Sequence, residues 1–227
     1  MLLAAGSGTR VGADTNKVLL PLAGRRVLTW SLTWTDRVAA VVATLVVIRP
    51  ADRDQVTSIL SREAPGRPVG VVSGGPTRHS SEFAALTALA PRIESGEVDV
   101  VVIHDAARPL AGTRLFADAI DTAHVLGGAL PVLAQPGLLP VNGDAPPVED
   151  LVTVQTPQAF RARPLLEAYR AADREGFDGT DTAVCVQRFG GLPIRGLPGG
   201  PANIKITFPE DLFLAERILA AHHWHMP

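Results

Sequence analysis

The sequence predicts an α/β fold of Rossmann-like type, in which a mostly parallel sheet carries helices on both faces. Three observations support this prediction. Short runs rich in valine and isoleucine recur along the chain, segments with helical spacing of apolar residues separate them, and polar clusters follow several of the runs. Such alternation is typical of a parallel sheet whose crossovers are helices. We expect a single domain over residues 1–227, which is long enough to bury a substantial core.

Each element is predicted from its residue pattern. Continuous β-branched runs indicate buried strands, and amphipathic spacing indicates helices. A proline at the first position favours the last helix, because that position needs no backbone N–H. In chain order we expect a strand of about five residues from Met1, a strand over 39–48, a helix over 51–62, a strand over 69–73, a helix over 80–89, a strand over 98–104, a helix over 113–125, a strand over 127–134, helices over 163–174 and 182–189, a strand over 202–207 and a helix over 209–221.

One proline-rich segment interrupts this alternation. Residues 135–148 hold four prolines and two glycines, and Asn142-Gly143 favours a hairpin turn. We interpret the segment as a small arm, at about residues 133–152, that projects from the domain.

Composition excludes several classes of protein. The formal net charge of −2 gives no sign of broad electrostatic binding to nucleic acid. No apolar run has the length of a membrane span, and the first residues do not resemble a signal peptide. The single cysteine, Cys185, cannot form an intramolecular disulfide, which fits a reducing compartment. We therefore expect a cytoplasmic protein without a membrane partner. Because the first strand begins almost at Met1, the native start could lie upstream.

The first polar cluster is a glycine-rich turn that follows the first strand. It reads Leu3-Ala4-Ala5-Gly6-Ser7-Gly8-Thr9-Arg10 and continues to Lys17. Small residues allow backbone N–H groups to approach phosphates, and two cations beside such a cradle suit a triphosphate. The spacing matches neither a Walker loop nor the dinucleotide fingerprint. A plain tight turn is the alternative.

Three further clusters are expected at the same edge, because ligands of parallel sheets lie outside the carboxyl ends of the strands. Gly74 to Ser81 either read a base edge or simply cap a helix with a serine. Asp105, at a strand end, is either a ligand of Mg²⁺ or half of a surface ion pair. Lys205, within an apolar stretch, either points into the site or protects a sheet edge.

Together these motifs resemble one family over nearly the whole chain, the 2-C-methyl-D-erythritol 4-phosphate cytidylyltransferases of the non-mevalonate isoprenoid pathway. The motifs occur in the family's order. They are Ala-Ala-Gly-Ser-Gly-Thr-Arg with Lys17, Gly-Gly-Pro-Thr-Arg-His-Ser-Ser, His-Asp-Ala-Ala-Arg-Pro, Gln155-Thr156-Pro157-Gln158-Ala159-Phe160, Gly179-Thr180-Asp181, Asn-Ile-Lys-Ile-Thr and Pro209-Glu210-Asp211-Leu212.

The resemblance implies a CTP-dependent nucleotidyltransferase that acts through Mg²⁺ and forms a homodimer through the arm. Arg10, Lys17 and Lys205 would be catalytic. CTP would contact Ala4, Ala5, Gly6, Gly8, Gly75, Ser81, Asp105 and Ala106. The acceptor phosphate would contact Arg108, Thr156 and Thr180, and Asp105 would also face the metal. An acceptor phosphate oxygen would attack the α-phosphorus of CTP in line, with positioning and charge neutralisation lowering the barrier.

The arm departs from the family's pattern. After a Pro-Val pair the family carries Asp-Thr-x-Lys, whereas here Pro131-Val132 precedes Leu-Ala-Gln-Pro-Gly, and Val148 stands where the family has an arginine. Loss of polar partners should weaken recognition of methylerythritol phosphate. Two alternatives follow: a paralogue that uses another acceptor, such as a pentitol phosphate, and a non-catalytic CTP-binding module.

Overall fold

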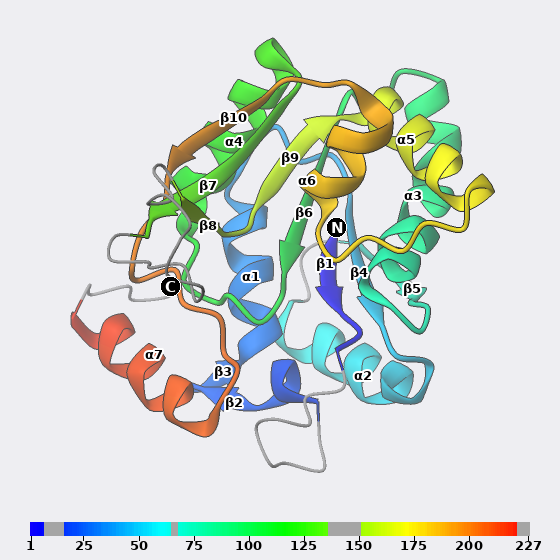
Figure 1. Ribbon diagram of the computed structural model, residues 1–227. Coiled ribbons are helices and arrows are strands. Elements are labelled where there is room, and N and C mark those ends of the chain that lie inside the picture. Colours follow the sequence, from blue (N-terminus) through cyan, green and yellow to red (C-terminus); the bar gives the residue numbers. More distant parts are fainter. Residues whose placement is uncertain (7–15, 65–67, 136–150, 222–227) are drawn as a thin grey trace, which may run out of the picture.

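A computed structural model describes residues 1–6, 16–64, 68–135 and 151–221 of the chain. Its centre is an eight-stranded sheet with the order β10-β7-β9-β6-β1-β4-β5, and β8 pairs with β7 beside this path (Figure 1). The strands are β1 (Leu2–Ala4), β4 (Thr44–Ile48), β5 (Val69–Ser73), β6 (Val100–Asp105), β7 (Gly128–Ala134), β8 (Val152–Val154), β9 (Gln158–Arg161) and β10 (Ile194–Pro198). A separate small hairpin joins β2 (Pro21–Leu22) to β3 (Arg25–Arg26).

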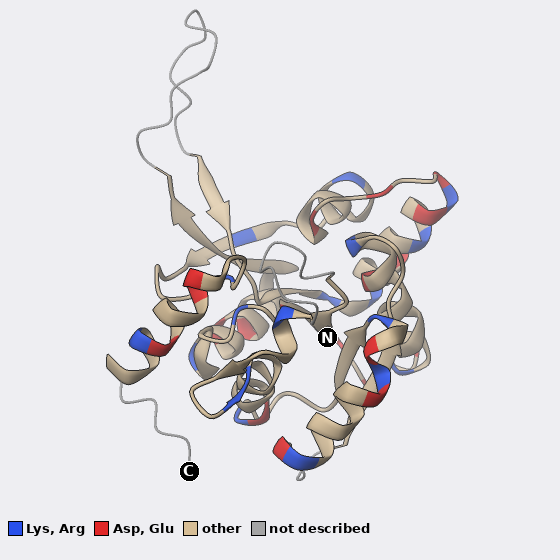
Figure 2. Cartoon of the chain, turned by 90° about the horizontal axis from the view of Figure 1, so that it is seen from below, with Lys and Arg blue, Asp and Glu red and all other residues tan. Residues whose placement is uncertain are grey.

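Most of the sheet is parallel, as predicted. The strands β5, β4, β1 and β6 pair in parallel, and so do β7 and β10 at the other edge. Between these two parts lies β9, which runs antiparallel to both β6 and β7. The β7–β8 pair is also antiparallel and stands out from the body of the molecule at the base of the predicted arm (Figure 2). Residues 136–150 of that arm lie outside the described residues.

Helices cover both faces of the sheet, which confirms the predicted layers (Figure 1). On one face, α1 (Val27–Asp36), α2 (Arg53–Glu63) and α4 (Gly112–Leu126) pack on the strands, and α7 (Pro209–Ala221) packs against α1 and α4. On the other face lie α3 (Arg78–Glu94), α5 (Ala162–Arg174) and α6 (Thr182–Cys185). Short helical turns are η2 (Lys17–Leu19), η3 (Pro50–Asp52) and η4 (Val186–Gly190).

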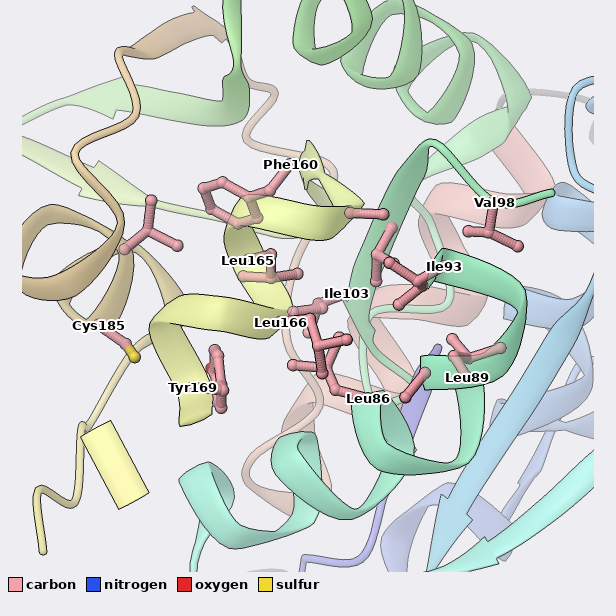
Figure 3. Packing of buried hydrophobic residues seen from close by; sticks show 14 of the residues in the cluster. Leu86, Leu89, Ile93, Val98, Ile103, Phe160, Leu165, Leu166, Tyr169 and Cys185 are labelled. Atoms are coloured by element: carbon pink, nitrogen blue, oxygen red, sulfur yellow. The ribbon is translucent and has the colours of Figure 1, made fainter. Parts of the chain in front are cut away.

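The best-packed region of the second face is the contact between α3, α5 and the central strands (Figure 3). Leu86 and Ile93 of α3 meet Leu165 and Leu166 of α5, and each is at most 2% exposed. Their spacing along each helix places them on one stripe, so burial of that stripe stabilises both helices. Phe160 of β9 completes the layer. Cys185 is a buried member of the same cluster.

Four predicted elements differ from the structure. The strand expected over 39–48 begins only at Thr44, and the first strand has three residues. The predicted helix over 182–189 is divided between α6 and the π-helical turn η4. Residues 202–207 form no strand: Ile206 donates a single backbone hydrogen bond to Ala107, at 2.8 Å, rather than joining a ladder. The last described strand is β10, which was not predicted and pairs with β7 at one edge of the sheet.

Helix α1 was not predicted, since its tryptophans and threonines carry a weak helical signal. Tertiary contacts stabilise it. Trp30 and Trp34 are nearly buried, and their indole nitrogens donate to the carbonyl oxygens of Leu22 and Pro109, at 2.9 and 2.7 Å. In the described part of the chain, no helix has the length and apolar character needed to cross a membrane.

Candidate active site

A cleft of about 650 Å³ opens at the carboxyl ends of β1 and β6, at the sheet edge where the sequence predicted a site. It brings together eight of the predicted residues from five separate segments. They are Ala4, Ala5, Gly6, Lys17, Gly75, Ser81, Asp105 and Lys205. Gly8 and Arg10 lie outside the described residues. The remaining predicted residues, Ala106, Arg108, Thr156 and Thr180, do not line this cleft.

Lys17 enters the cleft from the short turn η2, which a neighbouring amide holds in place. The side chain of Asn16 donates to the carbonyl oxygen of Ala4 at 2.7 Å and to Asp52 Oδ2 at 2.9 Å. Asp52 in turn accepts two hydrogen bonds from Arg49, each 2.8 Å long. Asn16 is 1% exposed, so these contacts form away from water, where unmade hydrogen bonds are costly. The turn is thereby fixed to β1, the strand that precedes the glycine-rich segment.

The two glycines after β5 are required by close packing against α3. A Cβ at Gly74 would lie 2.7 Å from Ser81 Oγ and 2.9 Å from Ala5 Cβ, and one at Gly75 would lie 2.4 Å from Ser80 Oγ. The helix is capped by Thr77, which forms a reciprocal capping box with Ser80. The N-cap residue is therefore Thr77, so the alternative prediction of a serine at this position is wrong. Ser80 takes part in the capping box as its third helical residue. Ser81 lines the cleft and donates to the carbonyl oxygen of Gly75 at 3.2 Å.

Asp105, at the end of β6, lies between two cations. Arg78 Nη1 is 2.5 Å from its Oδ1, and Lys205 Nζ is 2.6 Å from its Oδ2. Burial disfavours the charged form, but the charges of Arg78 and Lys205 outweigh burial and hold the pKa of this carboxyl well below its usual range. Asp105 is therefore ionised at neutral pH. Lys205 points into the cleft, and 39% of its side chain stays exposed.

Arg78 is a site residue that sequence reasoning missed. It lies on the first turn of α3, directly after the glycine-rich turn, and lines the cleft. The sequence did contain a signal for it. Arg78 follows the strand predicted over 69–73, and Asp105 follows the strand predicted over 98–104, so both were expected near the same edge of the sheet. Arg78 is more buried than Lys205, with 24% of its side chain exposed.

A buried polar layer supports Asp105 from behind. Thr156 accepts a 3.0 Å hydrogen bond from the Asp105 N–H and lies 3.0 Å from His104 Nδ1. Asn203 donates to the Thr156 carbonyl oxygen at 3.0 Å and to Gln155 Oε1 at 3.2 Å. Burial lowers the pKa of His104 to about 3, so this imidazole is neutral at physiological pH.

The three predicted acceptor residues belong to this layer or lie beyond it. Thr156 is 3% exposed, and Arg108 donates from Nη1 to the Asn203 carbonyl oxygen at 2.7 Å, behind the loop that carries Lys205. Thr180 is exposed and precedes Asp181, the N-cap of α6. Their proposed contacts with substrate stay predictions.

The donor atoms of the cleft do not build a metal site by themselves. In the described ranges, no group of three or more His, Cys, Asp or Glu side chains could hold a metal ion. Among the described residues that line the cleft, Asp105 is the one carboxylate, and both its oxygens already face cations. Direct coordination by Asp105 would require displacement of Arg78 or Lys205, so this set of residues does not fit a protein-held Mg²⁺.

The parallel sheet, the glycine-rich first turn and the cations around one cleft define a nucleotidyltransferase of the α/β type. Residues 1–221 match the family model of 2-C-methyl-D-erythritol 4-phosphate cytidylyltransferase. The chain belongs to this family.

Individual relatives agree with this assignment. The chain is 36% identical to the 2-C-methyl-D-erythritol 4-phosphate cytidylyltransferase of Prochlorococcus marinus, with 97% of each chain covered. It is 37% identical to that of Parasynechococcus marenigrum, over 97% of this chain and 96% of the relative. Among solved structures, 4-diphosphocytidyl-2C-methyl-D-erythritol synthase from Anaerococcus prevotii has a TM-score of 0.81 and 27% identity, over 96% of this chain and 94% of the other. The Thermus thermophilus cytidylyltransferase has a TM-score of 0.72 and 30% identity, over 96% and 97%.

Proposed function

We propose that this enzyme joins CTP to 2-C-methyl-D-erythritol 4-phosphate and releases pyrophosphate, since its relatives are named as cytidylyltransferases of this phosphate. The observation that carries the proposal is that two lysines from separate segments line one cleft at the carboxyl ends of the strands. Lys17 lies beside the glycine-rich segment, and Lys205 lies beside Asp105.

The reaction follows from these charges. A phosphate oxygen of the acceptor attacks the α-phosphorus of CTP and forms a new P–O bond, while the bond from the α-phosphorus to the bridging oxygen breaks and pyrophosphate leaves with its electron pair. Because the attacking oxygen is already anionic, no strong general base is needed. His104 is buried and neutral behind the cleft, and we assign it a structural role. The barrier is lowered by positioning and by neutralisation of developing charge.

The proposed roles divide between the two sides of the cleft. On the nucleotide side, Ala4 to Gly6 approach the phosphates through their backbone, and Lys17 stabilises charge on the α-phosphate and the departing pyrophosphate. On the acceptor side, Lys205 holds the acceptor phosphate, and Asp105 holds Lys205. Gly8 and Arg10 are proposed to complete the nucleotide side.

Three further proposals accompany this one. The reaction is expected to need Mg²⁺, which would be held mainly by the triphosphate, because the protein side offers no open set of ligands. The enzyme is expected to form a homodimer through the arm, at whose base Leu151, Val152 and Val154 are exposed apolar residues. It is expected to work in the cytoplasm.

The test is pyrophosphate release from CTP and Mg²⁺, with and without 2-C-methyl-D-erythritol 4-phosphate. Rapid release that depends on this acceptor supports the proposal. Release only with another alcohol phosphate, such as a pentitol phosphate, would reassign the acceptor. Tight CTP binding by calorimetry without release under any of these conditions would contradict an enzymatic role.

A further inference from the structure

Glu82, on the second turn of α3, is a carboxylate that does not line the cleft and is only 1% exposed. Three side chains contact it. The Tyr169 hydroxyl of α5 donates to Oε2, the Thr182 hydroxyl of α6 donates to Oε1 at 3.0 Å, and Arg78 Nε lies 2.9 Å from Oε1. Tyr169 lies 87 positions after Glu82 in the chain, and Thr182 lies 100 positions after it, so separate elements converge on one buried carboxylate.

This carboxylate begins a row of alternating charges that ends in the cleft. Arg78 contacts Glu82 through Nε and Asp105 through Nη1, and Asp105 contacts Lys205 through its other oxygen. The Glu82 side chain, at one end of the row, is 1% exposed, whereas that of Lys205, at the other end, is 39% exposed. Glu82 is thus connected to the reacting side of the cleft through Arg78 and Asp105.

The rigidity of the guanidinium group makes this connection directional. Its nitrogens lie in one plane with a fixed fork, so the ion pair that keeps Nε 2.9 Å from Glu82 Oε1 also limits where Nη1 points, although Nε itself makes no hydrogen bond among the described residues. A guanidinium without that anchor prefers to place two nitrogens on one carboxylate. On Asp105, such a bidentate pair would occupy both oxygens, including the one that now contacts Lys205.

The burial of a carboxylate at position 82 calls for an explanation, because a buried charge is costly in free energy unless it is paired and hydrogen-bonded. Burial raises the pKa of the Glu82 carboxyl, and Arg78, Tyr169 and Thr182 each oppose that rise by stabilising the charged form. An apolar residue would fill the same space without this cost.

We propose that Glu82 is a positioning residue for the transfer reaction: it anchors Arg78 so that Asp105 keeps one carboxylate oxygen for Lys205 and holds the ammonium group on the acceptor side of the cleft. The inference rests on the roles proposed above for Asp105 and Lys205. It concerns geometry, since Glu82 itself does not touch the substrates.

The test is Glu82→Gln, which keeps the shape of the side chain and removes its charge. We expect kcat to fall by about 10- to 100-fold, as for small misplacements of a catalytic group, while KM for CTP stays unchanged because Lys17 and the glycine-rich segment are untouched. A variant damaged only in its folding would also show a lower apparent kcat at unchanged KM, so active-site titration and circular dichroism are used to refer kcat to the concentration of folded enzyme. Unchanged kcat in folded Glu82→Gln would overturn the proposal.

A double-mutant cycle tests the route through Arg78. If Glu82 acts by anchoring Arg78, then Glu82→Gln should add no further loss to an Arg78→Lys variant. Independent, multiplicative losses would contradict that route and leave Glu82 as a structural group only.

The matched control is Glu63→Gln. Like Glu82, Glu63 accepts a hydrogen bond from a threonine hydroxyl, that of Thr29 at 2.8 Å, and forms an ion pair with an arginine, Arg26. Neither Glu63 nor these two partners line the cleft. Glu63→Gln should leave kcat unchanged. Lys205→Ala in the same assay separates the two levels of inference: full activity there would refute the proposed site, whereas full activity of Glu82→Gln alone would refute only the anchoring role.

Two less disruptive variants test the proposal if Glu82→Gln does not fold. Tyr169→Phe and Thr182→Val each remove one hydrogen bond to Glu82 and preserve its charge. Each should lower kcat, with the same unchanged KM for CTP. Wild-type kcat in both variants would overturn the proposal.

Discussion

The two sides of the cleft are held in different ways. On the nucleotide side, Lys17 follows an asparagine that reaches β1 and Asp52, and the ion pair of Asp52 with Arg49 is local, three residues apart. On the acceptor side, Lys205 depends on Asp105, which lies 100 positions earlier in the chain and is itself supported by Arg78 and Thr156.

This difference indicates how each side should respond to change. The nucleotide side is built from neutral amide contacts and a nearby ion pair, so damage should stay local. The acceptor side is a network of coupled charges in a region of low dielectric constant, where loss of one member alters all the others. On both sides a buried asparagine shortly precedes the lysine. Asn16 precedes Lys17, and Asn203 precedes Lys205.

The largest expected effects come from the two lysines. Lys17→Ala and Lys205→Ala should each lower kcat by about two to four powers of ten, because each removes a charge that faces the reacting phosphates. Pyrophosphate release measures the loss, and thermal melting checks the fold. Near-normal turnover of either folded variant would contradict its assigned role.

Acid should destabilise the acceptor side through His104. The pKa of His104 is lowered by burial to about 3, whereas the unfolded chain protonates near 6.5. Between pH 3 and pH 6.5 the unfolded state therefore binds more protons than the folded state. The contribution of His104 to the free energy of unfolding is complete above pH 6.5 and is lost as the pH falls toward 3, by a few kcal/mol. Urea unfolding at several pH values measures this loss. In a His104→Asn variant the dependence should be flatter over this range, and an unchanged slope would show that other groups cause it.

The two asparagines offer a matched comparison of the sides. Asn16→Ala should raise KM for CTP and Asn203→Ala should raise KM for the acceptor, each with a stability loss of about 1–3 kcal/mol from buried groups left unpaired. Steady-state kinetics with each substrate varied in turn distinguishes them. If both variants raised the same KM, the division of the cleft into two sides would be wrong.

The smallest effect is expected at the base of the arm. If the family's motif is aligned one residue beyond the position directly after Pro131-Val132, its Asp and Thr stand at Ala134 and Gln135, the first at the end of β7 and the second just after it. The double variant A134D/Q135T should lower KM for methylerythritol phosphate by roughly 3- to 10-fold, the value of one recovered hydrogen bond. Ala134→Ser serves as a control at the same position. No change in KM would mean that this enzyme holds the acceptor differently.

Much of the fold could be predicted because its strands are continuous β-branched runs and its ligand edge follows from parallel topology. The same logic placed Asp105, Lys17 and Lys205 together. Helix α1 could not be predicted, since buried tryptophan contacts rather than local propensity stabilise it. The strand predicted over 202–207 was wrong because an apolar pattern cannot show whether the segment joins a ladder or packs beside Ala107.

The site was predicted less completely than the fold. The motifs gave the residues that face the cleft, but a sequence does not reveal which buried groups hold them. Glu82 was missed for this reason: the groups that contact it include Tyr169 and Thr182, which are remote in the chain. Thr156 was predicted to contact the acceptor, whereas the structure shows it hydrogen-bonded to the Asp105 backbone; its contact with substrate stays a prediction.

The reversed strand β9 connects the base of the arm to the candidate active site. Because β9 runs opposite to β6, the residues that precede it, not those that follow it, reach the carboxyl end of β6. Those residues come directly from the arm, since β8 ends at Val154 and Thr156 is only two positions further on. A shift at the base of the arm would therefore reach the backbone of Asp105 through two peptide units and the hydrogen bond of Thr156.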